Sequence, residues 1–174
     1  MASLAHPPTP TVSTWVARFA AAIKASGAAL DLACGSGRHA RYLAELGLQV
    51  EAVDRDAAAL AQLEGVPRVT TRCADLEAGA WPYAGCTFDA IVVTNYLHRP
   101  LFPLLAAALA PGGVLIYETF RLGNESYGSL RIRIFCCGPA NCLNLPRRLG
   151  SRCWPLRTVS SLCPNRQWCS DCVR

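Results

Sequence analysis

The sequence predicts an α/β fold, with a doubly wound and mostly parallel sheet covered by helices on both faces. Short apolar runs alternate with helical patterns over residues 28–120, the order that consecutive βαβ units produce. Residues 88–95 are mostly apolar, as expected for a parallel strand that is covered on both faces. In such a sheet, ligands bind outside the carboxyl ends of the strands.

The predicted elements follow one another with short connections. The first is a helix over 11–26, with Thr11 or Ser13 as its cap. Asp56 is expected to cap a later helix, and residues 111–113, Pro-Gly-Gly, mark a turn before the last strand. After the first helix, the predicted order is strand 28–33, helix 38–46, strand 48–54, helix 56–64, strand 69–74, strand 88–95, helix 101–110 and strand 114–120.

Length and composition set the broad class of the protein. The 174 residues suit one domain. No apolar stretch is long enough to span a bilayer, and residues 1–8 lack the basic start and apolar centre of a signal peptide. We therefore expect a cytoplasmic protein without a membrane partner, in a compartment where thiols stay reduced.

The composition changes abruptly after Gly128. Residues 1–128 have a net charge of −2, whereas residues 129–174 have a net charge of +7, no lysine and seven of the ten cysteines. This divides the chain into a core with an N-terminal helix (1–128) and an aberrant, Cys/Arg-rich tail (129–174). We expect the tail to be poorly ordered.

A shifted reading frame explains this tail. When each third base is joined to the next two, the codons of Phe135-Cys136-Cys137 give two leucines, and those of Asn141-Cys142 give a third. The codons of Gln167-Trp168-Cys169 give Met or Val followed by Val. Apolar strand residues thus reappear in the shifted frame. The tail is therefore expected to result from a one-base deletion near the Gly128 codon.

A glycine-rich turn is the strongest candidate for a ligand site. Gly35 and Gly37 follow the apolar strand that contains Asp31, and a helical pattern starts at once. Glycine lets the backbone approach a ligand, and the helix start offers free N–H groups. The next strand ends at Asp54, at the spacing expected for an acid that binds a ribose diol.

Further candidates follow the other strands. Asp75 and Leu76 suit recognition of an adenine ring, although a simple strand-end turn is the alternative; Cys34 is expected to be a packing residue, and His98 is the candidate proton acceptor. His39 is expected to be packed or solvated rather than catalytic. The complete cofactor-binding set is Asp31, Ala33, Cys34, Gly35, Gly37, Asp54, Arg55, Asp75, Leu76, Asn95 and Tyr96.

The order of these motifs from Trp15 to Gly128 resembles the class I S-adenosylmethionine-dependent methyltransferases. Within them it resembles small bacterial proteins related to tellurite-resistance methyltransferases. The resemblance implies a Rossmann-like sheet, S-adenosylmethionine as cofactor, and methyl transfer to a small-molecule or oxyanion acceptor. The family completes its sheet edge with an antiparallel pair of strands after Gly128. We expect this chain to be truncated there, to aggregate through strand 114–120 as a bare edge, and to have impaired activity.

Two alternatives stay open. Gly35-x-Gly37-x-x-Ala40 also fits a looser dinucleotide fingerprint, which would indicate an NAD(P)-dependent oxidoreductase. Cys169 and Cys172 have zinc-ligand spacing, and the tail arginines suggest RNA binding. However, the tail has no histidine and no recognisable nucleic-acid-binding module, so neither a metal site nor a nucleic-acid partner is expected. The sequence leaves the oligomeric state open.

Overall fold

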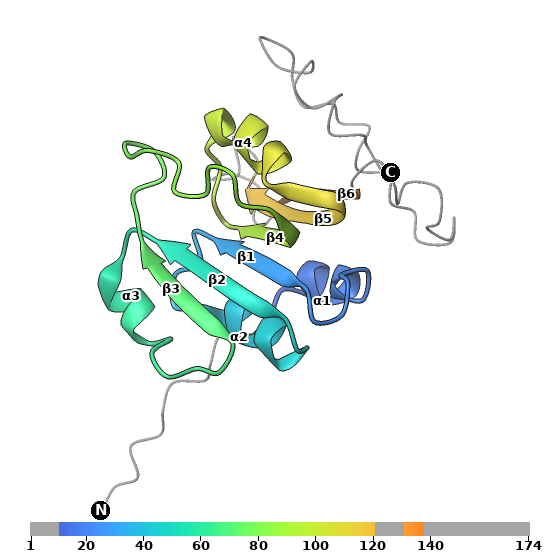
Figure 1. The fold of residues 1–174 in the computed structure, drawn as a ribbon, viewed down its shortest axis with the longest axis horizontal. Coiled ribbons are helices and arrows are strands. Elements are labelled where there is room, and N and C mark those ends of the chain that lie inside the picture. The colour runs from blue at the N-terminus through green and yellow to red at the C-terminus, as the bar shows by residue number, and fades with distance from the viewer. Residues whose placement is uncertain (1–10, 121–130, 138–174) are drawn as a thin grey trace, which may run out of the picture.

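The computed structural model describes residues 11–120 and 131–137 (Figure 1). These residues form a six-stranded sheet in the order β3-β2-β1-β4-β5-β6. The first five strands are parallel, and β6 pairs with β5 in the antiparallel direction. The strands are β1 (Ala28–Leu32), β2 (Gln49–Asp54), β3 (Val69–Cys73), β4 (Phe88–Thr94), β5 (Leu109–Phe120) and β6 (Arg131–Cys137).

Short helices connect the parallel strands and cover both faces of the sheet (Figure 1). The helices are α1 (Thr14–Ala20), α2 (Arg38–Glu45), α3 (Ala57–Ala61) and α4 (Phe102–Ala107), and one 3-10 turn, η1 (Arg99–Leu101), precedes α4. This arrangement confirms the predicted α/β fold. Within the described part of the chain, no helix is long and apolar enough to cross a membrane.

The core has two layers because successive strand residues point to opposite faces. On one face, α1, α2 and α3 pack against strand residues such as Ala29, Val92 and Ile116. On the other face, α4 and the segment before β4 pack against neighbours such as Leu30 and Ile91. From Ala90 onward, the odd-numbered residues of β4 thus face the second layer and the even-numbered ones face the first, whereas Phe88, before the irregularity in the β4–β5 pairing, packs in the second layer.

The helices α1 and α3 are shorter than the sequence predicts. Ser13 caps α1 by accepting a hydrogen bond from the N–H of Trp15 at 3.1 Å, but the helix ends at Ala20. The next amides bond to carbonyls three residues earlier, as in Ile23 N–H to Ala20 at 3.0 Å, which tightens the chain into turns. Asp56 caps α3 as predicted, although α3 spans only 57–61.

β5 starts earlier than predicted and contains a bulge. Phe88 is paired with Leu109 and Ala90 with Val114, so one residue of β4 lies opposite four of β5 between these pairs. The Pro-Gly-Gly turn lies inside this irregularity, where Gly112 has a φ of 79°. The helix before it therefore ends at Ala107 rather than at residue 110.

The far edge of the sheet differs from the sequence prediction. One of the two edge strands expected to be missing is present, because β6 pairs with β5 from Phe120–Arg131 to Val114–Cys137. The expectation that β5 forms a bare edge is therefore wrong. The alternating sequence of residues 131–135 was the signal for this strand. The other predictions for the tail, including those for Cys142, Cys153, Cys163, Cys169 and Cys172, lie outside the described residues.

Candidate functional site

The turn after β1 has a strongly constrained backbone. Ala33, Gly35 and Gly37 all have positive φ angles, of 55°, 54° and 76°. A Cβ atom on Gly37 would lie 2.4 Å from the side chain of Leu63, whereas one on Gly35 would meet nothing within 4 Å. Gly37 is therefore required both by its conformation and by its packing, and α2 starts directly after it.

Asp54 at the end of β2 is bonded to this turn. Its Oδ2 accepts a hydrogen bond from the N–H of Gly35 at 2.8 Å, and its Oδ1 accepts one from the N–H of Asp56 at 3.0 Å. A carboxylate oxygen can accept two hydrogen bonds. Asp54 therefore keeps acceptor capacity for a ligand while it fixes the turn.

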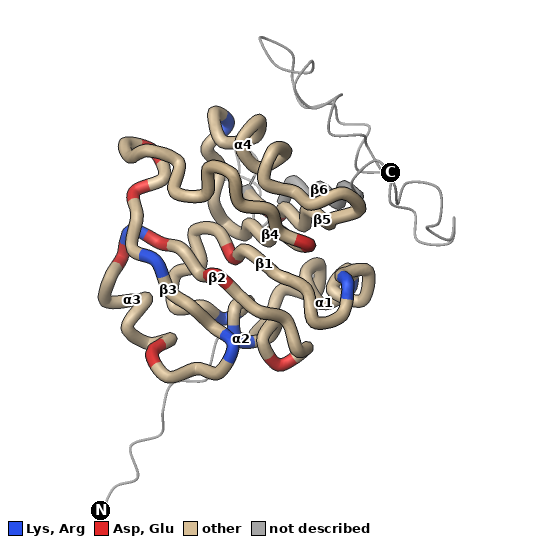
Figure 2. The backbone as a smooth tube through the Cα atoms, viewed as in Figure 1, with Lys and Arg blue, Asp and Glu red and all other residues tan. Residues whose placement is uncertain are grey.

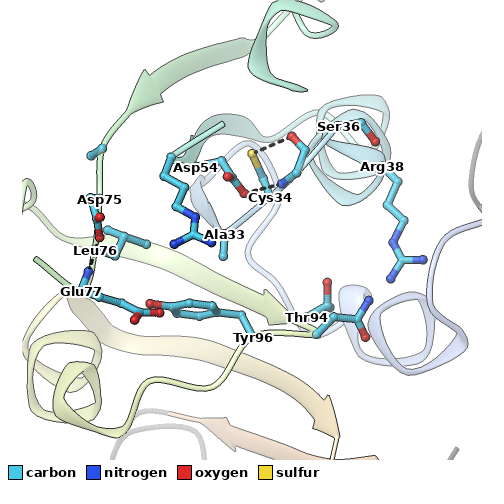
Figure 3. A pocket seen from close by; sticks show the side chains of 14 residues that line it. Ala33, Cys34, Ser36, Arg38, Asp54, Asp75, Leu76, Glu77, Thr94 and Tyr96 are labelled. Carbon is cyan, nitrogen blue, oxygen red and sulfur yellow. Dashed lines mark hydrogen bonds between the residues drawn. The ribbon is translucent and has the colours of Figure 1, made fainter. Parts of the chain in front are cut away.

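A cavity of about 490 Å³ lies at the carboxyl ends of the parallel strands (Figure 3). This is within the range of small-molecule and cofactor sites. The cavity brings together nine of the predicted residues: Ala33, Cys34, Gly35, Asp54, Arg55, Asp75, Leu76, Asn95 and Tyr96. The clustering agrees with the expected location of the site, and the roles of these residues stay predictions.

Five lining residues were missed by the sequence analysis: Ser36, Arg38, Ala74, Glu77 and Thr94. Each is adjacent in sequence to a predicted residue, so adjacency to the strand-end motifs was the available signal. Figure 2 shows acidic and basic positions together at the ends of β2 and β3. The cavity lining accordingly contains both carboxylates and guanidinium groups, which suits a ligand that carries both signs of charge.

Asp31 does not line the cavity. It is buried in β1, and neither carboxylate oxygen makes a hydrogen bond within the described part of the chain. Burial raises the pKa of Asp31 to about 7; the backbone amide of Ala40 and the guanidinium of Arg38 partly offset this effect, and the Asp54 carboxylate adds to it. The cost of burying an unpaired charge explains the direction.

Gly37 and His98 also lie outside the cavity lining. Gly37 instead shapes the turn, through its positive φ angle and its close packing against Leu63. His98 is the cap residue of η1, where its carbonyl accepts a hydrogen bond from the N–H of Leu101 at 3.1 Å. The catalytic role of His98 stays a prediction.

The ionisable groups of the cavity have distinct environments. Asp75 forms the strand-end turn, since its Oδ1 accepts hydrogen bonds from the N–H groups of Glu77 and Ala78, which lower its pKa. Burial raises the pKa of the Cys34 thiol, which therefore stays protonated and unsuited to nucleophilic attack. Burial also raises the pKa of Tyr96 to about 12, with the Glu77 carboxylate adding to the effect.

A buried polar network connects α1 and α2 with the ends of β4 and β5. The N–H of Ser13 donates to His39 Nε2 at 3.2 Å, and His39 Nδ1 lies 3.2 Å from Thr94 Oγ1. The Ser13 hydroxyl donates to Glu118. His39 is thus packed, as predicted, and burial lowers its pKa to about 4, with Arg38 adding to this effect and Glu118 opposing it.

No cluster of three potential metal ligands occurs among residues 11–120 and 131–137. The cysteines of the tail lie outside this range, apart from Cys136 and Cys137 in β6.

Known proteins are similar to part of this chain. Residues 29–113 match the family described as a methyltransferase domain. The protein-L-isoaspartate O-methyltransferase of Chlorobaculum tepidum is 36% identical over 114 residues, which cover 62% of this chain and 52% of that protein. The chain therefore spans about half the length of this curated relative.

Two solved structures share the fold. A TehB-like S-adenosylmethionine-dependent methyltransferase from Corynebacterium glutamicum is 22% identical, with a TM-score of 0.54, over 66% of this chain and 70% of that one. A glycopeptide N-methyltransferase, MtfA, complexed with sinefungin is 24% identical, with a TM-score of 0.52, over 71% of this chain and 58% of that one. With the strand order and the glycine turn described above, these similarities show that the chain has the Rossmann-like fold of the class I methyltransferases.

Proposed function

We propose that this chain binds S-adenosylmethionine and transfers its methyl group to a small-molecule or oxyanion acceptor. The observation that carries the proposal is the hydrogen bond between Asp54 and Gly35, both of which line a cavity of cofactor size. It places an acid and a glycine turn together at the carboxyl ends of two adjacent parallel strands. The match of residues 29–113 to a methyltransferase domain and the 36% identical relative support the same function.

The charges around the cavity fit this cofactor. S-adenosylmethionine carries a sulfonium, an ammonium and a carboxylate. Asp31 is a buried carboxylate without a hydrogen bond in the described residues, and a cationic ligand nearby would favour its ionised form. Arg38 in the cavity lining offers the opposite charge for a carboxylate.

Different residues of the cavity are proposed to contact different parts of the cofactor. Asp54 is proposed to accept hydrogen bonds from the ribose hydroxyls, and Asp75 with Leu76 to contact the adenine ring. Ala33 to Gly37 form a turn whose backbone lies close to the ligand. In Figure 3, Asp75 and Leu76 lie at one end of the cavity, and Arg38 and Thr94 at the other.

The proposed chemistry places few demands on acid–base groups. When bound, S-adenosylmethionine supplies an electrophilic methyl group on a sulfonium. The protein residues must hold the acceptor in line with this methyl group and exclude water. His98 is proposed to take a proton from acceptors that carry one, because it follows β4 on the chain, close to Asn95 and Tyr96 of the cavity.

Ligand binding tests this proposal directly. S-adenosylhomocysteine should raise the melting temperature of the full chain, kept in reductant, and calorimetric titration should give a single binding site. NAD and NADP should have no effect. Stabilisation by NAD alone would indicate the oxidoreductase alternative and would overturn the methyltransferase proposal.

The acceptor is proposed to be a small molecule of the kind suggested by the tellurite-resistance resemblance. The structural likeness to TehB-like proteins supports the fold only, at 22% identity. Transfer of a labelled methyl group should be measured with tellurite, small amines and an isoaspartyl peptide, the last because of the curated relative. Methylation of the isoaspartyl peptide alone would contradict the small-molecule proposal.

We also propose that the residues after Gly128 are translated out of frame and that activity is impaired as a result. The support is the change in charge and cysteine content at this position, together with the leucine and valine codons that the shifted frame restores. Sequencing the gene and its transcript across the Gly128 codon tests the deletion. Full activity of the unrepaired chain, equal to that of a frame-repaired version, would contradict the impairment.

A further inference from the structure

The network around His39 has a fixed direction of hydrogen bonding. The backbone N–H of Ser13 is only a donor, and it points at His39 Nε2 over 3.2 Å. Nε2 must therefore be the unprotonated nitrogen of the ring. Burial, which lowers the pKa of His39 to about 4, keeps the ring neutral near pH 7. A neutral ring with a bare Nε2 carries its proton on Nδ1.

The proton on Nδ1 determines what Thr94 does. His39 Nδ1 lies 3.2 Å from Thr94 Oγ1, so the imidazole N–H donates and the threonine oxygen accepts. The reverse direction would need a proton on Nε2, facing the N–H of Ser13. Thr94 Oγ1 thus accepts a hydrogen bond from inside the protein through one of its two lone pairs. Its own hydrogen remains available to donate.

Thr94 lies at the cavity wall. It is the last residue of β4, is 8% exposed and belongs to the cavity lining, whereas His39 behind it is 1% exposed. Figure 3 shows Thr94 at the same end of the cavity as Arg38, away from Asp75 and Leu76. If the adenine and ribose occupy the Asp75 and Asp54 end, the amino-acid part of the cofactor reaches the Thr94 and Arg38 end.

We propose that the Thr94 hydroxyl donates a hydrogen bond to the carboxylate of the bound cofactor, and that His39 is the positioning residue that imposes this direction. The proposal rests on the proposed function, since it names the part of the cofactor that this end of the cavity recognises. Arg38 supplies the positive charge there, and Thr94 supplies a directed neutral donor.

This chain of hydrogen bonds starts at the N-terminal cap of α1. Ser13 is the cap of α1, and its hydroxyl donates to Glu118 of β5 while its N–H donates to His39. The hydroxyl cannot rotate freely, because Trp15 N–H already donates to it at 3.1 Å. Docking of α1 therefore determines the tautomer of His39 and, through it, the donor direction of Thr94.

The test compares two ligands that differ only at the end in question. S-adenosylhomocysteine has the amino-acid group with its carboxylate and ammonium, and 5′-methylthioadenosine has a methyl group in its place. In the full chain, Thr94→Val should weaken binding of S-adenosylhomocysteine about tenfold, the effect of losing a hydrogen bond to a charged group. Binding of 5′-methylthioadenosine should not change. Thr94→Ser, which keeps the hydroxyl, is the matched control and should bind both ligands as the unaltered protein does.

The role of His39 has its own measurement. His39→Leu should show the same selective loss as Thr94→Val, and the double variant should lose no more than either alone. Long-range ¹H–¹⁵N correlation spectra of the imidazoles should show His39 as the Nδ1–H tautomer, and they are simple because the chain has three histidines.

The outcomes separate the two proposals. Equal affinity of Thr94→Val and the unaltered protein for S-adenosylhomocysteine overturns this inference and leaves the proposed function intact. An equal loss of affinity for both ligands would mean that Thr94 has a merely structural role, and this also overturns the inference. An Nε2–H tautomer of His39 overturns it as well. Failure of the unaltered protein to bind either ligand overturns the proposed function itself.

Discussion

The Oδ2 atom of Asp54 accepts a hydrogen bond from the N–H of Gly35 at 2.8 Å. One carboxylate thus connects the end of β2 to the glycine turn that follows β1, across 19 residues of sequence. The acid proposed to bind the ribose and the turn proposed to face the cofactor are therefore one unit. A change at Asp54 acts on both.

Replacement of Asp54 should weaken cofactor binding. Asp54→Ala is expected to reduce the affinity for S-adenosylhomocysteine by roughly 1–3 kcal/mol, because ribose hydroxyls would lose a charged acceptor. Calorimetric titration gives this value. Asp56→Ala is the matched control, since it removes the cap of α3 but no cavity contact. An unchanged dissociation constant for Asp54→Ala would remove this residue from the site.

Alanine at Gly37 should destabilise the fold much more than alanine at Gly65. Both glycines have similar positive φ angles, 76° and 73°, but a Cβ on Gly37 would lie 2.4 Å from Leu63, and one on Gly65 would meet nothing within 4 Å. We expect a loss of unfolding free energy of about 2–4 kcal/mol for Gly37→Ala and about 1–2 kcal/mol for Gly65→Ala. Urea denaturation measures both, and equal losses would show that Leu63 moves aside.

Two buried ionisable groups should give opposite pH dependences of stability. The pKa of Asp31 is raised from 3.8 to about 7, so the folded state favours its protonated form, and its contribution to stability is lost as pH rises through this interval. The pKa of His39 is lowered from 6.5 to about 4, so its contribution is lost as pH falls through that interval.

Variants that remove one group at a time should reveal these two pH dependences of stability. In the unaltered protein they partly cancel between about pH 4 and 6.5. Asp31→Asn should be less stable at pH 4 than at pH 7, because only the pH dependence that His39 causes remains. His39→Gln should show the reverse. Melting temperatures across this range test both, with the exposed Glu45→Gln as a control that keeps the original profile. Parallel profiles for all the variants would contradict this account.

The glycine turn and the acid that contacts it were predictable because these residues follow local rules. Gly35, Gly37 and Asp54 stand at spacings imposed by a strand, a turn and a helix, and the strand order then brings them together. The capping of α3 by Asp56 was equally local. Such signals need only neighbouring residues and the repeat of the backbone.

Other parts of the site depend on contacts between distant elements. Ser13 and His39 are 26 residues apart, and Ser13 and Glu118 are 105 apart. Nothing in the sequence near His39 shows which nitrogen accepts and which donates. The bulge in β5 is also a tertiary effect, since it adjusts β5 to β4. These features require the assembled sheet, so local sequence signals do not show that Thr94 is hydrogen-bonded to His39.

The direction of β6 determines where the two ends of this strand attach to the rest of the chain. Arg131 lies opposite Phe120 at the carboxyl ends of the parallel strands, where the cavity lies. Cys137 lies opposite Val114, toward the other end of β5. Phe120 and Arg131 thus both lie on the cavity side of the sheet. A fusion partner attached directly after Cys137, or a chain terminated there, would leave the sheet at the strand ends remote from the cavity. Cys137 is therefore the point at which the tail can be exchanged with the least direct disturbance of ligand binding.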